Sequence, residues 1–283
     1  MIVVTGASGQ LGRLVIQELL ARVPASSIVA AVRKPASVAD LAAKGVQVRE
    51  ADYTRPETLD AAFKGADKVL LISSSEVGQR VAQHRHVVDA VKRAGVSLLA
   101  YTSLLHADTS PLGLAAEHVA TEAAIQASGV PAVILRNGWY TENYLASVPV
   151  ALQHGAFIGC AGAGRIASAA RADYAAAAAA ALTQEGQAGR VYELAGDESY
   201  TLSDLAAVLS AATGKQIPYV DLPQSEFEAA LAGAGLPQPV AALLADSDAG
   251  AARGGLFDDG HQLSGLIGRP TSSLVSLLKH ALA

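Results

Sequence analysis

The stretch Thr5-Gly6-Ala7-Ser8-Gly9-Gln10-Leu11-Gly12 decides the fold of this 283-residue chain. Its glycines are spaced G-x-x-G-x-x-G. The apolar run Ile2–Thr5 leads into it, and the helical pattern Leu11–Ala21 leads out of it. A glycine-rich turn between a buried strand and a helix is typical of the first β-α-β unit of a nucleotide-binding sheet. We therefore expect a strand, a tight turn and a helix here.

Each glycine of this turn has a different task. Gly6 permits the tight turn, Gly9 lets the backbone approach a pyrophosphate, and Gly12 lets the helix pack closely on the strand. Free N–H groups and the helix dipole favour negative charge at the start of a helix. The residues that we expect to hold the phosphates of a dinucleotide are Gly6, Ala7, Ser8, Gly9, Gln10 and Leu11. The alternative is a turn that needs glycine but binds nothing.

The first half of the chain alternates short apolar runs with helical patterns. The expected strands are Ile2–Thr5, Ile28–Val32, Val46–Arg49, Val69–Ile72, Leu98–Thr102 and Ala132–Leu135. The expected helices are Leu11–Ala21, Val38–Lys44, Pro56–Phe63, Val81–Ala94 and Ala115–Ala127. Near-continuous apolar runs are typical of parallel strands that are buried on both faces. The alternation predicts an α/β fold with a doubly wound parallel sheet of the Rossmann type.

This rhythm changes after Leu135. We expect further helices at Asp173–Thr183, Thr201–Ala212, Glu226–Ala234, Pro239–Ala245 and Ser272–Ala281, and short strands at Val191–Leu194 and Ile217–Val220. Thr201 and Asp204 are spaced as a capping box. We predict two domains. Residues 1–150, to which residues 171–195 return, carry the nucleotide site, and residues 151–283 form a smaller, mainly helical C-terminal lobe on the substrate side.

Composition excludes several classes of protein. A hydrophobic fraction of 51% with 17% charged residues excludes a disordered chain. The net charge of −5 argues against nucleic acid as the main partner. The apolar run Tyr174–Leu182 is far shorter than the roughly 20 residues that span a bilayer. A single cysteine, Cys160, fits a reducing compartment. We expect a cytoplasmic protein with no targeting segment and no membrane insertion.

The end of the second expected strand indicates which dinucleotide binds. Proteins that use NAD usually place Asp or Glu about 20 residues after the glycine turn, where it accepts a hydrogen bond from the ribose 2′-hydroxyl. Here the sequence reads Val32-Arg33-Lys34 and has no acid. Arg33 can clamp a 2′-phosphate with its planar fork, so we predict NADPH as the cofactor. The alternative is that Arg33 and Lys34 are two solvated surface cations.

Polar residues follow the third and fourth expected strands. Ser73, Ser74 and Ser75 lie at the carboxyl end of the fourth strand, the edge where ligands bind in open α/β sheets. Their hydroxyls could line the cofactor, or the three serines could form an ordinary polar turn. Asp52 could contact adenine, or it could simply cap the helix that starts near Pro56.

Four longer segments resemble a known family: Ile72–Arg80, Tyr101–Gly113, Leu135–Tyr144 and Gly254–Asp259. They resemble the NmrA-like branch of the short-chain dehydrogenase/reductase family, and within it the members that reduce quinones. The similarity runs over essentially the whole chain. It implies NADPH as hydride donor, a quinone as acceptor, and a substrate pocket between the two lobes. It also implies that the nicotinamide half of the cofactor is flanked by Asn137, Gly138, Trp139, Tyr140, Thr141 and Glu142.

One part of the family's usual apparatus is absent. The resemblance places Leu114 and His118 where the family has the tyrosine and lysine of Tyr-x-x-x-Lys, and it places Thr102 near the family's active-site serine. A quinone is an activated acceptor, so a strong general acid is less necessary, and water, Tyr140 or His106 could supply the proton. A hydrogen-bonded loop histidine is the alternative for His106.

Aromatic residues next to the expected nicotinamide site suggest how a flat substrate could bind. Trp139 and Tyr140 could stack on a quinone, or they could pack in the core between the lobes. Asn143 could orient a carbonyl group. We therefore expect hydride transfer from NADPH to a quinone, with Tyr140, Asn143, Thr102 and His106 as candidate catalytic residues.

Two other functions and the oligomeric state stay open. The chain could be a non-catalytic NADP(H)-sensing regulator, as other NmrA-like proteins are, or it could reduce another flat electrophile such as a triphenylmethane dye. A homo-oligomer is also possible on this sequence. No spacing of histidines typical of a metal site is present, and we expect no metal.

Overall fold

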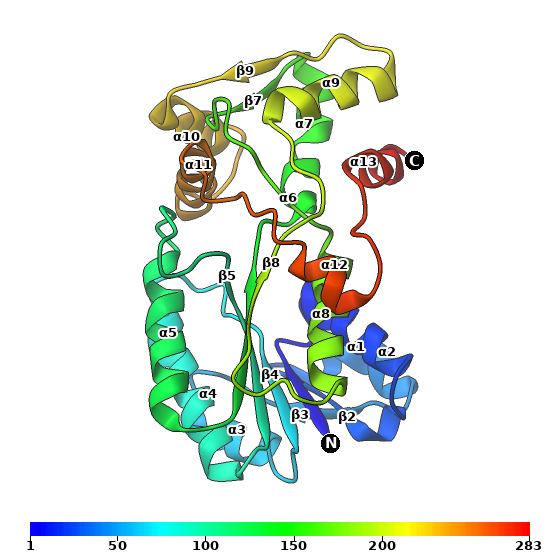
Figure 1. Cartoon of the computed structure of the whole chain (residues 1–283), viewed down its shortest axis with the longest axis vertical. Helices are drawn as coiled ribbons and strands as arrows, with labels where there is room; N and C mark the ends of the chain where they lie inside the picture. Colours follow the sequence, from blue (N-terminus) through cyan, green and yellow to red (C-terminus); the bar gives the residue numbers. More distant parts are fainter.

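Seven parallel strands form the central sheet of the computed structural model, which describes residues 1–283 (Figure 1). The strands lie in the order β3-β2-β1-β4-β5-β6-β8. Their bounds are β1 Ile2–Thr5, β2 Ile28–Val32, β3 Gln47–Glu50, β4 Lys68–Leu71, β5 Leu98–Leu104, β6 Ala132–Asn137 and β8 Val191–Leu194. Val4 of β1 pairs with Ala30 of β2 on one side and with Leu70 of β4 on the other. This arrangement confirms the predicted doubly wound α/β fold.

Helices cover both faces of the sheet because successive strand residues point to opposite sides. Val4 faces one layer, which consists of α1 Gln10–Leu20, α2 Ala39–Ala43, α8 Arg171–Thr183 and α12 Gln262–Ile267. Val3 faces the other, which consists of α3 Pro56–Ala62, α4 Arg80–Ala94 and α5 Ala115–Ser128. Residues 175–181 of α8 are all buried alanines. Their small side chains let α8 lie close against α1 and the sheet.

A second group of elements lies beyond the carboxyl ends of the strands (Figure 1). It contains α6 Thr141–Leu145, α7 Val148–His154, α9 Leu202–Thr213, α10 Gln224–Gly233, α11 Gln238–Ala252 and α13 Leu274–Leu282. Two short parallel strands, β7 Phe157–Gly159 and β9 Tyr219–Asp221, join this group. The two 3₁₀ turns, Ala25–Ser27 and Pro35–Val38, flank β2 instead. These elements confirm the expected lobe of C-terminal helices.

A local sequence signal sets the start of α9. The capping box is confirmed, because the hydroxyl of Thr201 accepts from the backbone of Asp204 at 3.1 Å and the Asp204 carboxylate accepts from the Thr201 backbone at 2.9 Å.

None of the helices combines the length and the apolar character that a membrane-spanning helix requires.

Contacts between distant parts of the chain place the ends of other helices and strands away from their predicted positions. Strand β5 continues to Leu104 because that residue still pairs with Asn137 of β6. Helix α11 runs beyond Ala245 to Ala252, since Ala249 and Ala251 are buried. The predicted strand Ile217–Val220 is β9, which begins two residues later because Tyr219 pairs with Phe157. Helices α6, α7 and α12 were not predicted.

Candidate functional site

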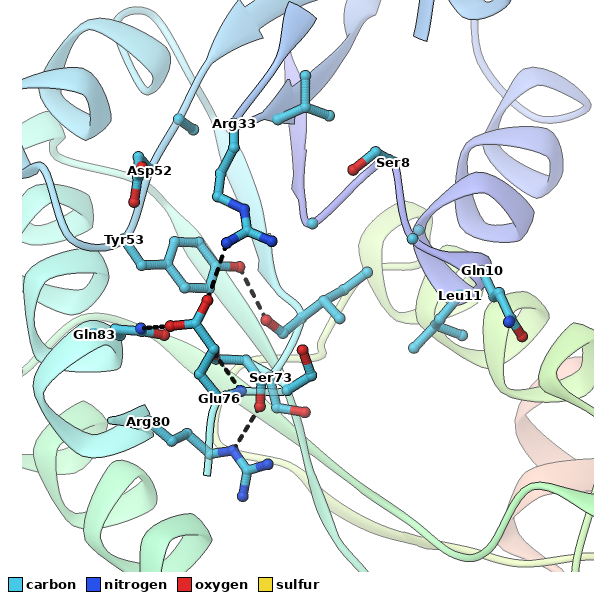
Figure 2. Close-up of a pocket in the computed structure, with 18 of the residues that line it drawn as sticks. Ser8, Gln10, Leu11, Arg33, Asp52, Tyr53, Ser73, Glu76, Arg80 and Gln83 are labelled. Atoms are coloured by element: carbon cyan, nitrogen blue, oxygen red, sulfur yellow. Dashed lines mark hydrogen bonds and ion pairs between the residues drawn. The ribbon is translucent and has the colours of Figure 1, made fainter. Parts of the chain in front are cut away.

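A cleft of about 430 Å³ opens at the carboxyl ends of β1, β2 and β4. The strand order reverses between β1 and β4, and such switch points are where ligands bind in open α/β sheets. Figure 2 shows the glycine turn on one side of the cleft and the segment after β4 on the other. The predicted cofactor residues that line it are Gly6, Ser8, Gly9, Gln10, Leu11, Arg33, Ser73, Ser74, Ser75 and Tyr140. The cleft therefore collects residues from both halves of the expected nucleotide site.

The glycine turn is shaped to hold an anion. Gly6 has φ +60°, and a Cβ on Gly12 would lie 2.5 Å from the Gly6 carbonyl oxygen. The backbone N–H groups of Ser8, Gln10, Leu11 and Gly12 donate no hydrogen bond within the chain. Free N–H groups at the start of a helix bind phosphate, so this turn fits the pyrophosphate of a dinucleotide. Ala7 is buried and lies outside the cleft lining.

The end of the cleft next to Arg33, where we expect the adenosine of the cofactor, contains an acidic side chain that the sequence did not predict. We call it the adenosine end. Arg33 extends from the end of β2, and its Nη1 lies 3.0 Å from Oε1 of Glu76 (Figure 2). Glu76 comes from the segment between β4 and α4, and its Oε2 accepts a hydrogen bond from Gln83 at 2.7 Å. An acidic side chain therefore lies beside Arg33, although it comes from a residue 43 positions later in the chain. Only tertiary structure could reveal it.

Two residues after β3 complete this end. The Asp52 carboxylate accepts a hydrogen bond from the Thr54 backbone at 2.9 Å, and this bond holds the pKa of Asp52 below its usual value. The phenol of Tyr53 bonds to the hydroxyl of Thr5 and to the carbonyl of Ile72. Burial raises the pKa of Tyr53, so the phenol stays neutral. Asp52 and Tyr53 both line the cleft.

Buried side chains of β5 and α4 bind the backbone of the serine segment after β4. The Ser73 backbone N–H donates to the hydroxyl of Thr102 at 2.9 Å, and the Ser74 N–H donates to Nε2 of His84 at 2.9 Å. Burial lowers the pKa of His84 to about 3, so its imidazole is neutral and can accept this bond. Thr102 is 2% exposed. In this structure its hydroxyl positions Ser73.

At the opposite end of the cleft, Tyr140 and Arg171 lie together. The Arg171 guanidinium stands over the Tyr140 ring, 4.7 Å from its centroid, and donates to Oδ1 of Asn143 at 2.9 Å. The Glu142 carboxylate accepts from the Arg171 backbone at 2.9 and 3.1 Å, at the start of α8. Burial raises the pKa of Tyr140, opposed by the Asn137 amide and by Arg171. Arg171 was not predicted, because α8 was expected to start at Asp173.

The other residues expected beside the nicotinamide do not line the cleft. Gly138 donates its N–H to β8, Trp139 packs in the core of the C-terminal lobe, and Thr141 bonds to the hydroxyl of Ser168. Asn137 does not line the cleft either, but its buried Oδ1 is the one buried side-chain polar atom without a hydrogen-bond partner. Buried polar atoms are normally paired, so this oxygen is free to accept a hydrogen bond from a bound water.

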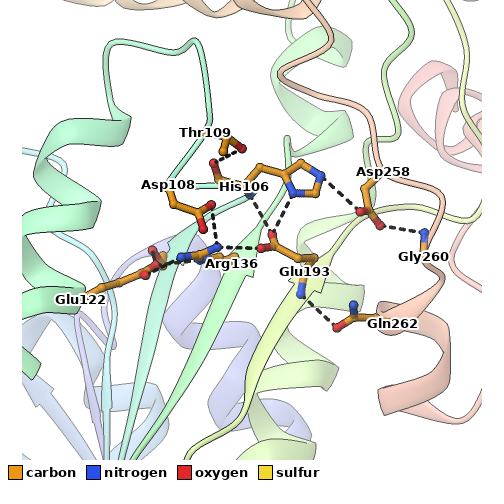
Figure 3. Close-up of polar contacts among 10 residues, drawn as sticks. His106, Asp108, Thr109, Glu122, Arg136, Glu193, Asp258, Gly260 and Gln262 are labelled. Atoms are coloured by element: carbon orange, nitrogen blue, oxygen red, sulfur yellow. Dashed lines mark hydrogen bonds and ion pairs between the residues drawn. The ribbon is translucent and has the colours of Figure 1, made fainter. Parts of the chain in front are cut away.

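His106 belongs to a separate polar network, which Figure 3 shows. Its Nε2 lies 3.2 Å from Asp258, and its Nδ1 lies 3.6 Å from Glu193. Its backbone has φ 50° and donates to Glu193 at 2.8 Å. Arg136 joins the network through Glu193 at 2.8 Å and through Glu122 at 2.8 Å. These contacts favour the loop-histidine interpretation, and His106 does not line the cleft.

His118 is also placed away from the cleft. It is buried in α5, and its Nδ1 lies 2.7 Å from the phenol oxygen of Tyr101. Burial lowers the pKa of His118 to about 3. The side chain at the usual lysine position is therefore a neutral core residue.

Comparison with known proteins agrees with this geometry. The NAD(P)H-binding family matches residues 6–185. The chain is 59% identical to quinone oxidoreductase 2 of Escherichia coli over 280 residues, which cover 99% of this chain and 98% of that protein.

Solved structures give the same result. The crystal structure of an Escherichia coli NADPH-dependent quinone oxidoreductase complexed with NADPH is 58% identical, covers 100% of both chains and has a TM-score of 0.98. The Citrobacter sp. triphenylmethane reductase complexed with NADP(H) is 38% identical, covers 99% of this chain and 100% of that chain, and has a TM-score of 0.96. The chain therefore belongs to the NAD(P)H-binding family.

Proposed function

We propose that this chain is an NADPH-dependent quinone oxidoreductase that transfers a hydride from NADPH to a quinone. The observation that carries the proposal is the full-length similarity, at 58% identity and a TM-score of 0.98, to a quinone oxidoreductase complexed with NADPH. The cleft supports it independently, because it joins a phosphate-binding turn, a cation at the adenosine end and an aromatic–guanidinium pair at the other end.

The residues of the cleft divide the work of holding the cofactor. The free N–H groups of Ser8, Gln10 and Leu11 bind the pyrophosphate. Arg33 binds the 2′-phosphate through charge-assisted hydrogen bonds. The serine segment, fixed by Thr102 and His84, forms the opposite wall. When bound, NADPH supplies the hydride.

Tyr140 and Arg171 are the residues that we assign to the substrate. A flat quinone can stack on the Tyr140 ring, which stays protonated because burial raises its pKa. Reduction of a quinone leaves negative charge on an oxygen atom, and a guanidinium fixed beside the substrate stabilises that charge. Asn143 holds Arg171 in place at 2.9 Å. Water then protonates the product, so no Tyr-x-x-x-Lys dyad is required.

The chain divides into two domains and has the features of a cytoplasmic protein. The central sheet and the helices on its two faces, including α8 and α12, form the NADP-binding domain, and the remaining helices with β7 and β9 form the substrate-side lobe. This division is supported by β8, which pairs with β6 in the central sheet. The single cysteine, Cys160, is buried and free, as suits a cytoplasmic protein.

Loss of NADPH absorbance in the presence of a panel of quinones tests the function directly. A triphenylmethane dye belongs in the same panel, because the 38% identity to triphenylmethane reductase favours a flat cationic dye as the second candidate substrate. We expect turnover with quinones. Turnover with the dye but with none of the quinones would show that the enzyme reduces dyes instead of quinones. Tight NADPH binding without any turnover would instead identify an NADP(H)-sensing regulator.

A further inference from the structure

The carboxylate of Glu76 and the guanidinium of Arg33 form an ion pair where the cofactor's 2′ substituent is expected. Arg33 donates its only side-chain hydrogen bond to Oε1 of Glu76, at 3.0 Å. The other carboxylate oxygen of Glu76 accepts from Gln83 at 2.7 Å, so the carboxylate is fixed from two sides (Figure 2). All three side chains line the cleft.

These two charges favour different cofactors. Arginine at this position accommodates the 2′-phosphate of NADP(H), whereas a carboxylate accepts a hydrogen bond from the 2′-hydroxyl of NAD(H). We propose that Glu76 is a specificity-determining residue that opposes the contact between Arg33 and the 2′-phosphate, and so narrows the preference for NADPH over NADH. This inference rests on the proposed use of NADPH.

Glu76 opposes the phosphate in two ways. It occupies the guanidinium that the phosphate needs, so the ion pair with Arg33 must open or be shared. It also places a negative charge 3.0 Å from the guanidinium nitrogen that would bind the phosphate, and like charges repel each other.

The exposure of the pair sets the size of the effect. The Arg33 side chain is 70% exposed and that of Glu76 is 44% exposed. Exposed ion pairs are weak and are screened by salt. Glu76 therefore moderates NADPH binding but does not block it, and its effect is electrostatic.

Binding of 2′,5′-ADP and 5′-AMP isolates this effect, because the two ligands differ only in the 2′-phosphate. The variant Glu76→Gln keeps the size of the side chain and can still bond to Gln83. We expect it to bind 2′,5′-ADP and NADPH about three- to tenfold more tightly, and 5′-AMP and NADH with less than about a twofold change. The gain should shrink at about 0.5 M salt because of screening.

A matched variant controls for net charge. Glu185→Gln removes the same charge from an exposed side chain outside the cleft, and we expect no change in any of the four affinities. Unchanged binding of 2′,5′-ADP by Glu76→Gln would overturn the proposal. So would an equal loss for all four ligands, which would show that Glu76 only shapes the segment after β4. Failure of the proposed function would look different. The wild-type protein would bind 2′,5′-ADP, but none of the quinones tested would lead it to oxidise NADPH.

Discussion

The two ends of the cleft are built in different ways. At the phosphate end, consecutive residues Gly6–Gly12 make the turn, and their free N–H groups need no help from other parts of the chain. At the substrate end, Tyr140 follows β6, and Arg171 begins α8 in a later part of the chain. The first end depends on backbone geometry, while the second depends on side chains that meet only in the folded protein. Changes at the two ends should therefore fail in different ways.

Gly12→Ala should give the largest effect. Its Cβ would lie 2.5 Å from the Gly6 oxygen and 2.7 Å from Cα of Ala7, both backbone atoms that cannot move alone. We expect a loss of about 1–3 kcal/mol of stability from overpacking. Loss of two charge-assisted hydrogen bonds to phosphate, at about 1.5–3 kcal/mol each, would weaken NADPH binding by at least about a hundredfold. Thermal unfolding and NADPH titration measure both.

The control for this change lies in α10. A Cβ on Gly233 would meet nothing within 4 Å, so Gly233→Ala should leave NADPH binding unchanged and alter stability by about 1 kcal/mol or less. Normal NADPH affinity in Gly12→Ala would show that the phosphate end does not depend on close backbone packing.

Arg33→Ala tests the adenosine end, where one side chain carries the preference. Charge-assisted contacts contribute about 1.5–3 kcal/mol, so NADPH affinity should fall roughly 10- to 100-fold. The loss should lie near the upper limit, because Glu76 would then face the 2′-phosphate without its partner. NADH affinity should hardly change. Equal losses for both cofactors, measured by titration, would make Arg33 a structural residue.

The same contrast explains how much the sequence predicted. The glycine turn, the strands and the capping box at Thr201 follow from local backbone requirements, so they could be predicted from the sequence. Glu76 and Arg171 could not. Glu76 reaches Arg33 because β1 lies between β2 and β4 in the sheet. Arg171 reaches Tyr140 because Ala169, just before α8, pairs with Tyr140. No local pattern marks such a contact.

Tyr140→Ala tests the substrate end. It removes both the ring on which a quinone can stack and the ring beneath the Arg171 guanidinium. Stacking and cation–π contacts each contribute about 0.5–1.5 kcal/mol, so quinone turnover should fall roughly tenfold while the fold is retained. Steady-state kinetics and circular dichroism measure these outcomes.

Tyr140→Phe is the matched control, because it keeps the ring and removes the hydroxyl. We expect its turnover to stay within about threefold of wild type. A loss as large as that of Tyr140→Ala would make the phenol a proton donor. Unchanged kcat and KM in Tyr140→Ala would place the substrate elsewhere.

His118→Ala should give the smallest effect on turnover. The residue stands at the family's usual lysine position, yet it is buried against the Tyr101 phenol at 2.7 Å, and burial holds its pKa at about 3. Its imidazole is therefore neutral at neutral pH and is a poor acid. Loss of a general acid costs about 10²–10⁴-fold, and we expect His118→Ala to cost less than about tenfold.

Two further measurements separate a core role from a proton-transfer role for His118. If hydride transfer limits turnover, NADPH deuterated at the transferring position should react more slowly in both wild type and His118→Ala. The variant should also lose stability, because the buried Tyr101 phenol loses its partner, at a cost of about 1–3 kcal/mol. A thousandfold loss of turnover with intact NADPH affinity would contradict this and make His118 the proton donor. The chemistry would then depend on a residue outside both ends of the cleft.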